Sequence, residues 1–400
     1  MEELRIRFGD EGVKQARIKV IGVGGAGGNA LNGMIEANLA GVEFIAINTD
    51  EQALEMSRAS VCLPIGHTGL GAGADPEVGR QAMEEDREKL FDLLIDTDLV
   101  FITAGLGGGT GTGASPIVAQ VAHEMGVLTV AVVTKPFFFE GRQRMVRAED
   151  GITRLKDHVD TLILIPNQRL VAIIERGTPL KEAFRKADEV LLQATRGISD
   201  LVMVPGLINL DFADVKTVMS AGGDALMGVG VAQGENRALE AAQQAIASPF
   251  MEDVCIQGAR AVLANITGNL SFDDYNEASN VVHEAVGDDA NIFVGAVVDP
   301  NMNDEVRVTV IATGFNHIRE RKQVVPEKEA KPAGDYPRQV AYRPLRKITE
   351  RPAILTPGST ESGPVQPTAS AKKLPLERPT AGIINLDDRN IPAFLRKQMD

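Results

Sequence analysis

The sequence predicts an α/β fold: a Rossmann-like parallel sheet with helices on both faces, a long central helix, a smaller mixed α/β domain and a disordered C-terminal tail. Short apolar runs alternate with helical stretches through the first half of the chain, a pattern typical of β-α-β units. Two glycine-rich segments each lie between such a run and the next helical stretch. Of the 40 glycines 36 lie before residue 317, and of the 20 prolines 11 lie after residue 316, which separates a folded body from a tail.

The first half of the chain is expected to form the parallel sheet. Its predicted strands, each a short apolar run of the kind that is buried on both faces, are residues 17–23, 42–48, 99–104, 127–134 and 161–166. The predicted helices run from the first glycine segment to about 39, from near 115, and from 180 to 201. The last of these is the long central helix, because Phe184, Val190 and Leu191 recur at helical spacing.

The pattern changes after this helix. Predicted strands at 226–232, 259–266, 291–298 and 306–312 are interrupted by helices at 235–247 and 272–286, which indicates a second, smaller unit with a mostly β core. The expected organisation is an N-terminal extension (1–16), a Rossmann-like domain (17–179), the central helix (180–203), a C-terminal domain (204–316), a disordered linker (317–385) and a terminal docking peptide (386–400).

The linker prediction depends on composition. From about Glu320 to Thr380 the apolar residues follow neither helix nor strand spacing and are mixed with Pro, Lys, Arg, Ser and Thr. Such a chain cannot bury enough apolar surface to offset the entropy of ordering. A loop-rich third domain is the alternative, which the proline content disfavours.

The formal net charge of −14 conceals two parts of opposite sign. Residues 1–316 carry 25 Lys and Arg against 45 Asp and Glu, a net −20, and residues 317–400 carry 16 against 10, a net +6. A body this acidic repels nucleic acid, which is therefore not an expected partner.

Membrane spans, secretion and cysteine-based sites are not expected either. No apolar run reaches the 18 residues of a span, and the charged start MEELRIRFGD lacks the apolar stretch of a signal peptide. With only Cys62 and Cys255 and no CxxC pair, neither a disulfide framework nor a structural zinc site is expected, and a reducing cytoplasm fits.

The first glycine segment, Gly22–Asn29 (GVGGAGGN), follows the first predicted strand. A turn there brings backbone N–H groups and the positive end of a helix dipole to one point, which suits an anionic phosphate. Its glycines also satisfy GxGxxG, and Asp50 closes the next strand about where a dinucleotide fold places its ribose-binding acid. Alone, the segment favours a nicotinamide or flavin enzyme, with a tight turn that binds nothing as the alternative.

The second glycine segment, Gly105–Gly113 (GLGGGTGTG), weakens the case for a nicotinamide or flavin enzyme. Each glycine costs roughly 0.5–1 kcal/mol relative to Ala in ordered structure, so this density is hard to explain by structure alone. The segment has no lysine and is not a P-loop; N–H groups, the Thr110 and Thr112 hydroxyls and the dipole of a helix with Pro116 in its first turn are expected to hold phosphates. A third segment, Gly69–Asp75 (GLGAGAD), could close over a terminal phosphate.

GGGTGTG after a Rossmann-like first half, with NLDFAD at 209–214 behind a long helix, resembles the tubulin/FtsZ family of GTPases. The resemblance spans about residues 17–315 and resumes in the last dozen residues. It implies a GTP-binding domain and a C-terminal activation domain joined by the central helix, with GTP or GDP and Mg²⁺ as the bound species. It also implies a self-assembling GTPase that polymerises head to tail into filaments of the bacterial cytokinetic ring, in the cytoplasm under the membrane at mid-cell. The alternatives are an NAD-dependent oxidoreductase, which gives GGGTGTG no role, and a non-hydrolysing scaffold, which leaves the NLDFAD aspartates without one.

The resemblance assigns ligand contacts residue by residue. Those that would surround the phosphates are Gly24, Gly25, Ala26, Gly27, Gly28, Asn29, Gly71, Ala72, Gly73, Gly107, Gly108, Gly109, Thr110, Gly111, Thr112 and Gly113. Glu140 and Arg144 match the ribose contacts, although their spacing alone favours a plain helical ion pair. Asn167 and Asp188 match the pair that reads guanine, with Phe184 one helical turn earlier to stack on the base. A carboxylate can accept from guanine N1–H and the 2-amino group, a pattern that adenine lacks; a solvated helix charge is the alternative for Asp188.

Asn209, Asp211 and Asp214 carry the catalytic prediction. From the residues alone, Asp211 precedes an apolar-periodic segment and is a candidate helix N-cap, with Asp214 a favourable acid of the first turn. The resemblance implies in addition that these residues complete the site of the neighbouring subunit, where they orient and activate the attacking water. Hydrolysis would then require polymerisation.

Residues 388–398 read DRNIPAFLRKQ. Apolar residues at helical spacing lie between a first-turn proline and two last-turn cations: Ile391, Pro392, Phe394, Leu395, Arg396 and Lys397. A peptide this short is not a stable helix alone, so it is expected to order in a partner's groove; a tail without function is the alternative. The resemblance implies docking onto FtsA-like membrane tethers and other division regulators.

Overall fold

The computed structural model describes residues 16–175, 177–204, 206–208, 210–251, 256–287, 290–299 and 302–315. All of them belong to the first of two units of the chain, Met1–Glu327. The predicted linker and the predicted docking peptide lie outside the described residues.

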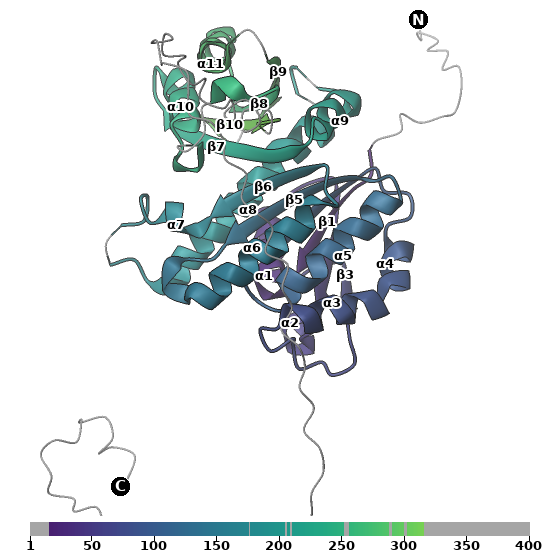
Figure 1. The fold of residues 1–400 in the computed structure, drawn as a ribbon. Coiled ribbons are helices and arrows are strands. Elements are labelled where there is room, and N and C mark those ends of the chain that lie inside the picture. The colour runs from purple at the N-terminus through teal and green to yellow at the C-terminus, as the bar shows by residue number, and fades with distance from the viewer. Residues whose placement is uncertain are drawn as a thin grey trace, which may run out of the picture. The chain divides into compact units, whose positions relative to one another are not determined.

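Within the described residues, ten strands form one sheet in the order β3-β2-β1-β4-β5-β6-β7-β10-β8-β9 (Figure 1). The first six pair in parallel: β1 (Ile18–Val23), β2 (Val42–Asn48), β3 (Val61–Pro64), β4 (Leu99–Gly105), β5 (Leu128–Lys135) and β6 (Thr161–Pro166). The others are β7 (Gly223–Gln233), β8 (Ala261–Gly268), β9 (Asn291–Val298) and β10 (Glu305–Thr313), of which β10 runs antiparallel to β7 and β8. The predicted strands and the parallel first half are confirmed. Patterning missed β3, because it has only four residues and ends in Pro64, and a proline weakens the strand signal of so short a run.

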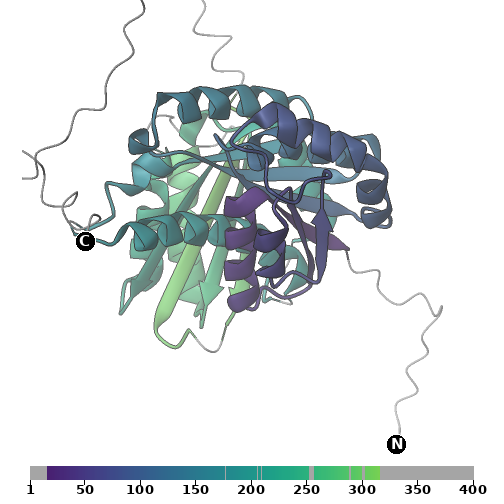
Figure 2. The ribbon, with the colours of Figure 1, turned by 90° about the horizontal axis from the view of Figure 1, so that it is seen from below.

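Helices cover both faces of the parallel part. On one face α1 (Gly24–Glu36) and α8 (Leu180–Met203) lie side by side; the other face carries α3 (Pro76–Glu85), α4 (Arg87–Leu93), α5 (Thr110–Glu124) and α6 (Arg142–Lys156) (Figures 1 and 2). Both faces are covered because the strands are apolar on both sides, as β1 shows. Ile18 and Val20 pack in the core with α1 and α8, whereas Ile21 and Val23 pack in the core with α3 to α6.

Five further helices complete the described part of the chain. They are α2 (Glu51–Glu55), α7 (Asn167–Leu170), α9 (Phe212–Ser220), α10 (Arg237–Ile246) and α11 (Phe272–Val286). Among the described helices, none combines the length and the apolar character that a bilayer span needs.

Two helices begin earlier than the glycine pattern predicts. The pattern predicts a turn over the first glycine segment, and α1 instead begins within it, at Gly24. It predicts a helix from near Ser115, but α5 begins at Thr110, so Pro116 lies inside the helix and not in its first turn. These predictions were wrong because they treated glycines as loop residues. In α5 the missing side chain instead lets two helices pack closely, since a Cβ built on Gly113 would overlap the Pro76 carbonyl oxygen of α3.

Helix α8 crosses the parallel sheet from its carboxyl edge to its amino edge. Near its start, Phe184 contacts the aromatic residues that follow β5. Further along, Arg196 donates to the Ala37 carbonyl at the end of α1 (2.6 Å), and Met203 packs against Gly41, just before β2. Its 24 residues correspond to about 36 Å at ~1.5 Å per residue. The residues that directly follow α8 are therefore far from the carboxyl edge.

The sheet is continuous across the predicted domain boundary near residue 203. Strands β6 and β7 pair in parallel at Thr161↔Gly223, Leu162↔Asp224 and Ile163↔Ala225. A separate group of buried residues fills the space between the C-terminal strands, α10 and α11. The division into two domains at this point stays a prediction.

Candidate functional site

Two glycine segments meet at the carboxyl edge of the parallel sheet. Strands β1 and β4 are parallel neighbours, so the segments that follow them leave the sheet at the same edge, where α/β folds bind ligands. Their backbones touch, since a Cβ built on Gly24, whose φ is +72°, would lie 2.8 Å from the backbone nitrogen of Gly111. Glycine alone tolerates both that φ and that approach. The fold thus brings the two segments together.

The third glycine segment joins them. The Gly71 N–H donates to the Thr49 carbonyl (3.0 Å), and a Cβ built on Gly109 would lie 2.7 Å from the Cβ of Ala72. Gly71 and Gly73 have φ of +85° and +56°, in the region that other residues rarely adopt. All three segments therefore share one site.

Most glycines of this site fall into one of two groups. Those whose built Cβ would press on a neighbouring segment are Gly24, Gly27, Gly107, Gly109, Gly111 and Gly113. Those with no atom within 4 Å of a built Cβ are Gly25, Gly28, Gly73 and Gly108. Gly25 and Gly28 line a pocket with Asn29, Asn32 and, from other elements, Asn48, Met56 and Ser57. The second group faces open space, where a ligand can approach the backbone closely.

Helices α1 and α5 present uncapped N-termini to the site. Neither has a side-chain cap or an acidic residue in its first turn. By contrast, α2 and α3 are capped by the carboxylates of Asp50 and Asp75. Free N–H groups and the positive ends of two helix dipoles favour an anion such as a phosphate.

The hydroxyls of the second segment are bonded within the protein. Thr110 Oγ1 lies 2.6 Å from Thr49 Oγ1, and Thr112 Oγ1 accepts from the Gly107 N–H at 2.8 Å. Both threonines are buried. They brace the segment, which leaves the N–H groups at the uncapped start of α5 to meet a phosphate. Sequence analysis did not find Thr49, which adjoins Asn48 at the end of an ordinary apolar strand.

Asp50 has a structural role here. Its Oδ1 accepts from the N–H groups of Gln52 (3.0 Å) and Ala53 (3.3 Å), as the N-cap of α2. The dinucleotide interpretation requires this acid for a ribose. Helix capping accounts for it without a nicotinamide cofactor.

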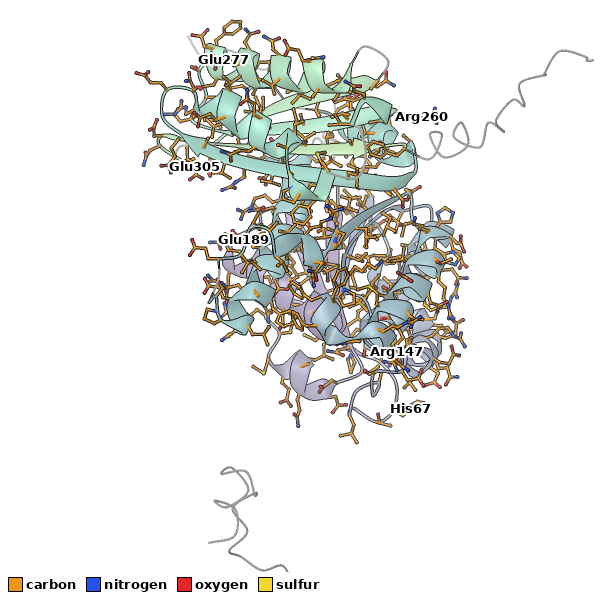
Figure 3. All side chains as sticks on the ribbon, turned by 60° about the vertical axis from the view of Figure 1, so that its left-hand side comes forward. His67, Arg147, Glu189, Arg260, Glu277 and Glu305 are labelled. Carbon is orange, nitrogen blue, oxygen red and sulfur yellow. The ribbon has the colours of Figure 1, made fainter. Side chains whose placement is uncertain are left out.

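Asn167 and Asp188 lie on two helices in contact, α7 and α8. Asn167 is buried, and its Oδ1 has no hydrogen-bond partner among the described residues. Burial raises the pKa of the Asp188 carboxyl to about 7. The next residue, Glu189, is exposed (Figure 3) and pairs with Lys186 at 3.0 Å. An unpaired buried acceptor and a desolvated carboxyl are groups that a base with N–H donors would satisfy.

Phe184 belongs to a group of three phenyl rings. Phe137 and Phe139 are stacked, with centroids 5.0 Å apart, and Phe184 meets both edge-on at 5.5 and 6.4 Å. The group forms an apolar wall one helical turn before Asp188. Sequence analysis found only Phe184; the run of three phenylalanines after β5 was the signal for the other two.

Glu140 and Arg144 form an ion pair. Arg144 Nη1 donates to Glu140 Oε2 at 2.6 Å, and Glu140 Oε1 accepts from the Phe137 N–H at 2.8 Å. They are not in one helix, because Gly141, at φ +99°, separates the 3-10 turn that ends at Glu140 from α6. A Cβ built on Gly107 would lie 2.7 Å from the Arg144 carbonyl oxygen. The pair therefore lies beside the second glycine segment.

Asp211 and Asp214 lie away from this site, beyond the end of α8. Asp211 is the N-cap of α9, and its Oδ1 accepts from the Asp214 N–H at 2.8 Å, which confirms the N-cap interpretation. The other end of α9 lies at the amino edge of the sheet, where the Thr161 hydroxyl donates to the Met219 carbonyl. Asn209 is outside the described residues. Figure 1 shows α9 in the upper part of this unit and α2 at its lower end.

Gly113→Ala should destabilise the protein by about 3 kcal/mol, because the new Cβ overlaps the Pro76 carbonyl and lies 2.7 Å from the Arg80 nitrogen. The matched control is Gly33→Ala in α1, where nothing lies within 4 Å of the built Cβ. That variant should be about 0.5–1 kcal/mol more stable than the parent. Urea unfolding of the full chain measures both, and equal stabilities would contradict the close packing of α3 on α5.

Comparison with known proteins places this site in a family. Residues 17–175 match the Tubulin/FtsZ family, GTPase domain, and residues 223–316 match the FtsZ family, C-terminal domain. The chain is 48% identical to the Cell division protein FtsZ of Azotobacter vinelandii, over 97% of this chain and 98% of that protein. It is 49% identical to the Cell division protein FtsZ of Pseudomonas aeruginosa, over 98% and 99%. The chain belongs to the FtsZ family.

Solved structures agree with this assignment. The empty FtsZ dimer of M. jannaschii matches with a TM-score of 0.73 and 44% identity, over 76% of this chain and 90% of that chain. The GTPgS-bound CetZ2 protofilament of Haloferax volcanii matches at 0.64 with 20% identity, over 76% and 97%, which shows a shared fold. This FtsZ-family chain is therefore a cell-division GTPase of a family that polymerises, and its GTPase domain binds GTP and GDP. The oxidoreductase and non-hydrolysing alternatives are not supported.

Proposed function

We propose that this GTPase polymerises head to tail and that GTP bound by one subunit is hydrolysed at a site completed by the next. One observation carries the proposal: the glycine segments lie at the carboxyl edge of the sheet, and Asp211 and Asp214 lie beyond the far end of α8. That helix is about 36 Å long. No side chain spans such a distance, so the aspartates can serve only a nucleotide held by another molecule.

GTP would bind along the carboxyl edge. Its phosphates would lie against Gly24–Asn29, Gly71–Gly73 and Gly107–Gly113 and accept from the N–H groups at the uncapped starts of α1 and α5, and Glu140 and Arg144 would flank the ribose. The guanine would lie against α7 and α8, where Asn167 presents its amide and ionised Asp188 accepts from N1–H and the 2-amino group. The Phe184 ring would contact the face of the base.

Asp211, Asp214 and Asn209 of the next subunit would orient the water that attacks the γ-phosphate and accept its proton, giving GDP and phosphate. In the described residues no group of three or more His, Cys, Asp or Glu side chains could hold a metal ion. We therefore expect Mg²⁺ to be held mainly by the triphosphate and by water, where it offsets phosphate charge.

Exposed apolar side chains at both ends of the unit support a head-to-tail contact. At the nucleotide end they are Met56, Leu70, Phe138 and Phe139; at the other end they are Leu207 and Ile208 before α9, and Phe272 at the start of α11. Grouped apolar side chains mark contact surfaces. A contact between two unlike ends repeats without closing and produces a filament.

GTP turnover per molecule should rise steeply as the protein concentration passes the assembly threshold, because the site is complete only between subunits. Phosphate release and light scattering, measured on the same samples, test this, and the scattering should decay as GTP is consumed. Constant turnover per molecule from far below to far above the threshold would exclude a shared site.

The predicted docking peptide would link the filament to a membrane tether at the division site. Its residues 391–397 lie outside the described part of the chain, so the proposal depends on their sequence pattern. Removal of residues 388–400 should leave GTP turnover intact and abolish binding to an FtsA-like tether. Unchanged tether binding would refute the assignment.

A further inference from the structure

A pair of buried hydroxyls joins the end of β2 to the start of α5. Thr49 Oγ1 lies 2.6 Å from Thr110 Oγ1, and the two residues are 5% and 9% exposed. Thr49 follows β2 directly, and its carbonyl accepts from the Gly71 N–H at 3.0 Å. Thr110 is the first residue of α5, and a Cβ built on Gly24 would lie 3.3 Å from its Cβ. The pair therefore lies where the three glycine segments meet.

The two hydroxyls carry two hydrogens but share only one contact. A threonine hydroxyl donates one hydrogen bond and can accept others, so one hydrogen lies between the two oxygens and the other needs a different acceptor. The described residues provide neither hydroxyl with a second hydrogen-bond partner. Hydroxyls in helices commonly donate to the carbonyl four residues earlier, as they do in Ser115, Thr153, Thr195 and Thr217. Within the described part of the chain, Thr110 lacks that bond.

The surroundings decide which hydroxyl donates. If Thr110 donated to Thr49, the hydrogen of Thr49 would be buried without an acceptor, which costs free energy. Thr49 precedes α2, and the Asp50 carboxylate already caps the start of that helix. If Thr49 donates instead, the free hydrogen belongs to Thr110, at the uncapped start of α5. An oxygen of a bound phosphate can accept it there.

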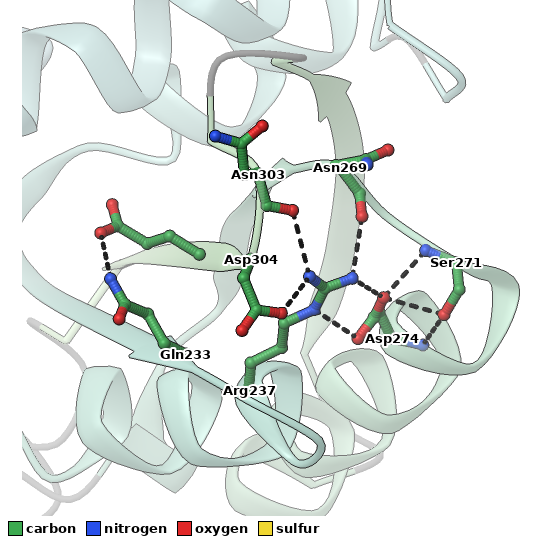
Figure 4. A network of polar contacts seen from close by, with 8 residues as sticks. Gln233, Arg237, Asn269, Ser271, Asp274, Asn303 and Asp304 are labelled. Atoms are coloured by element: carbon green, nitrogen blue, oxygen red, sulfur yellow. Dashed lines mark hydrogen bonds and ion pairs between the residues drawn. The ribbon is translucent and has the colours of Figure 1, made fainter.

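The network around Arg237 in the C-terminal half is a contrasting case (Figure 4). Its guanidinium forms two hydrogen bonds with the Asp274 carboxylate, at 2.9 and 3.3 Å. It also donates to the Asp304 carboxylate (3.2 Å) and to the carbonyls of Asn269 (2.9 Å) and Asn303 (3.5 Å). These contacts use all five N–H donors of an arginine. The protein alone satisfies Arg237, whereas the hydroxyl pair leaves one donor for a ligand.

We infer that Thr49 is a positioning residue for GTP, because it donates to Thr110 and thereby turns the Thr110 hydroxyl hydrogen toward a phosphate oxygen. This inference rests on the placement of the phosphates proposed above. Thr49 acts through Thr110 and makes no contact of its own with the nucleotide. Its side chain therefore affects phosphate binding and leaves base and ribose binding unchanged.

Thr49→Val tests this role, because valine has nearly the shape of threonine and lacks the hydroxyl. GTP binding should weaken about tenfold, since the Thr110 hydroxyl loses the partner that orients it toward a charged acceptor. Thr49→Ser keeps the hydroxyl and should restore the parent affinity. Nucleotide titration of the full chain below the assembly threshold measures both variants. Guanosine, which has no phosphate, should compete equally well for the parent and both variants.

A double variant tests whether Thr49 acts through Thr110. Thr110→Val should weaken GTP binding about tenfold or more. Thr49→Val combined with Thr110→Val should bind GTP no more weakly than Thr110→Val alone, because the two residues act as one unit. The matched control is Thr129→Val, which removes a buried hydroxyl bonded to the Val127 carbonyl (2.9 Å) near the amino edge of the sheet. It should leave GTP affinity unchanged.

Parent-like GTP affinity in Thr49→Val would overturn the inference, as would additive losses in the double variant or a weak Thr49→Ser. An equal loss of guanosine and GTP binding would also overturn it, since the defect would not concern the phosphates. If Thr110→Val weakens GTP binding and Thr49→Val does not, only the positioning role is wrong. If Thr110→Val binds GTP like the parent, the proposed placement of the phosphates beside Thr110 is itself wrong.

Discussion

Asp214→Ala should lower GTP turnover by about 10²-fold or more and leave GTP binding to the single subunit unchanged. A loss of this size is expected when a general base or a water-orienting carboxylate is removed. GTP binding is unchanged because Asp214 lies beyond the end of α8, away from the glycine segments. The cost in stability should be small, since the side chain acts on its own helix only as a first-turn acid. Nucleotide titration and phosphate release on the full chain measure the two properties separately.

Asp211 needs a different variant because it also caps α9 through its contact with the Asp214 N–H. Asp211→Ser keeps a capping oxygen and removes the carboxylate, so it should lose turnover with little loss of stability. Asp211→Ala should lose turnover and about 1 kcal/mol of stability. Weakened GTP binding in either variant would contradict the assignment of these residues to the neighbouring site.

Mixing two inactive variants provides the sharpest test of a shared site. Asp214→Ala binds GTP and lacks the acid, whereas a variant that cannot bind GTP still supplies both aspartates. If the site is shared, mixed filaments should recover part of the turnover that neither variant shows alone. No recovery, in filaments shown to contain both proteins, would argue against completion by the next subunit.

Asp188→Asn should weaken GTP binding by about 10²-fold or more, because two hydrogen bonds to a charged acceptor are lost at roughly 1.5–3 kcal/mol each. The amide can donate to the carbonyl that xanthine carries in place of the 2-amino group of guanine, so the variant should gain relative affinity for XTP. Glu189→Gln, on the exposed side of α8, is the matched control and should bind GTP normally. Equal GTP affinities of Asp188→Asn and the parent would remove Asp188 from the base site.

The raised pKa of Asp188 predicts a pH dependence of GTP binding. Burial raises this pKa to about 7, and guanine requires the ionised form, so affinity should fall as pH decreases through 7. Between pH 8 and pH 6 the ionised fraction changes about tenfold, and the dissociation constant should rise by the same factor. Asp188→Asn should lack this dependence. The free energy of unfolding of the nucleotide-free protein should change in the opposite sense. It should decrease as pH rises from ~4, near the pKa of this carboxyl in the unfolded chain, toward 7, because the folded state holds the proton more tightly.

The parallel sheet could be predicted because its strands are continuous apolar runs. Val20, Phe101 and Val130 are all buried, and no polar alternation obscures such strands. β3 could not be predicted, since this edge strand has only four residues, ends in Pro64 and is recognised only through its pairing with β2. The starts of α1 and α5 were also missed, because glycine has low helix propensity and packing against other segments overrides that preference.

The candidate site likewise has features that the sequence predicts and features that it does not. GGGTGTG and NLDFAD could be read from the chain, because each is a local pattern whose residue types suit phosphates or water. The Thr49–Thr110 contact and the ring group around Phe184 could not, since both join segments that are far apart in sequence.

By itself, the sequence determined the α/β class, the separation of an acidic folded body from a basic tail, and the glycine and aspartate motifs of a GTPase. These properties depend on composition and short-range spacing, which folding does not change. Only the tertiary structure decided that α8 separates the aspartates from the phosphate segments and that the Asp188 carboxyl is desolvated. Both follow from where a helix packs on the sheet, and packing depends on contacts between residues that local patterns do not relate.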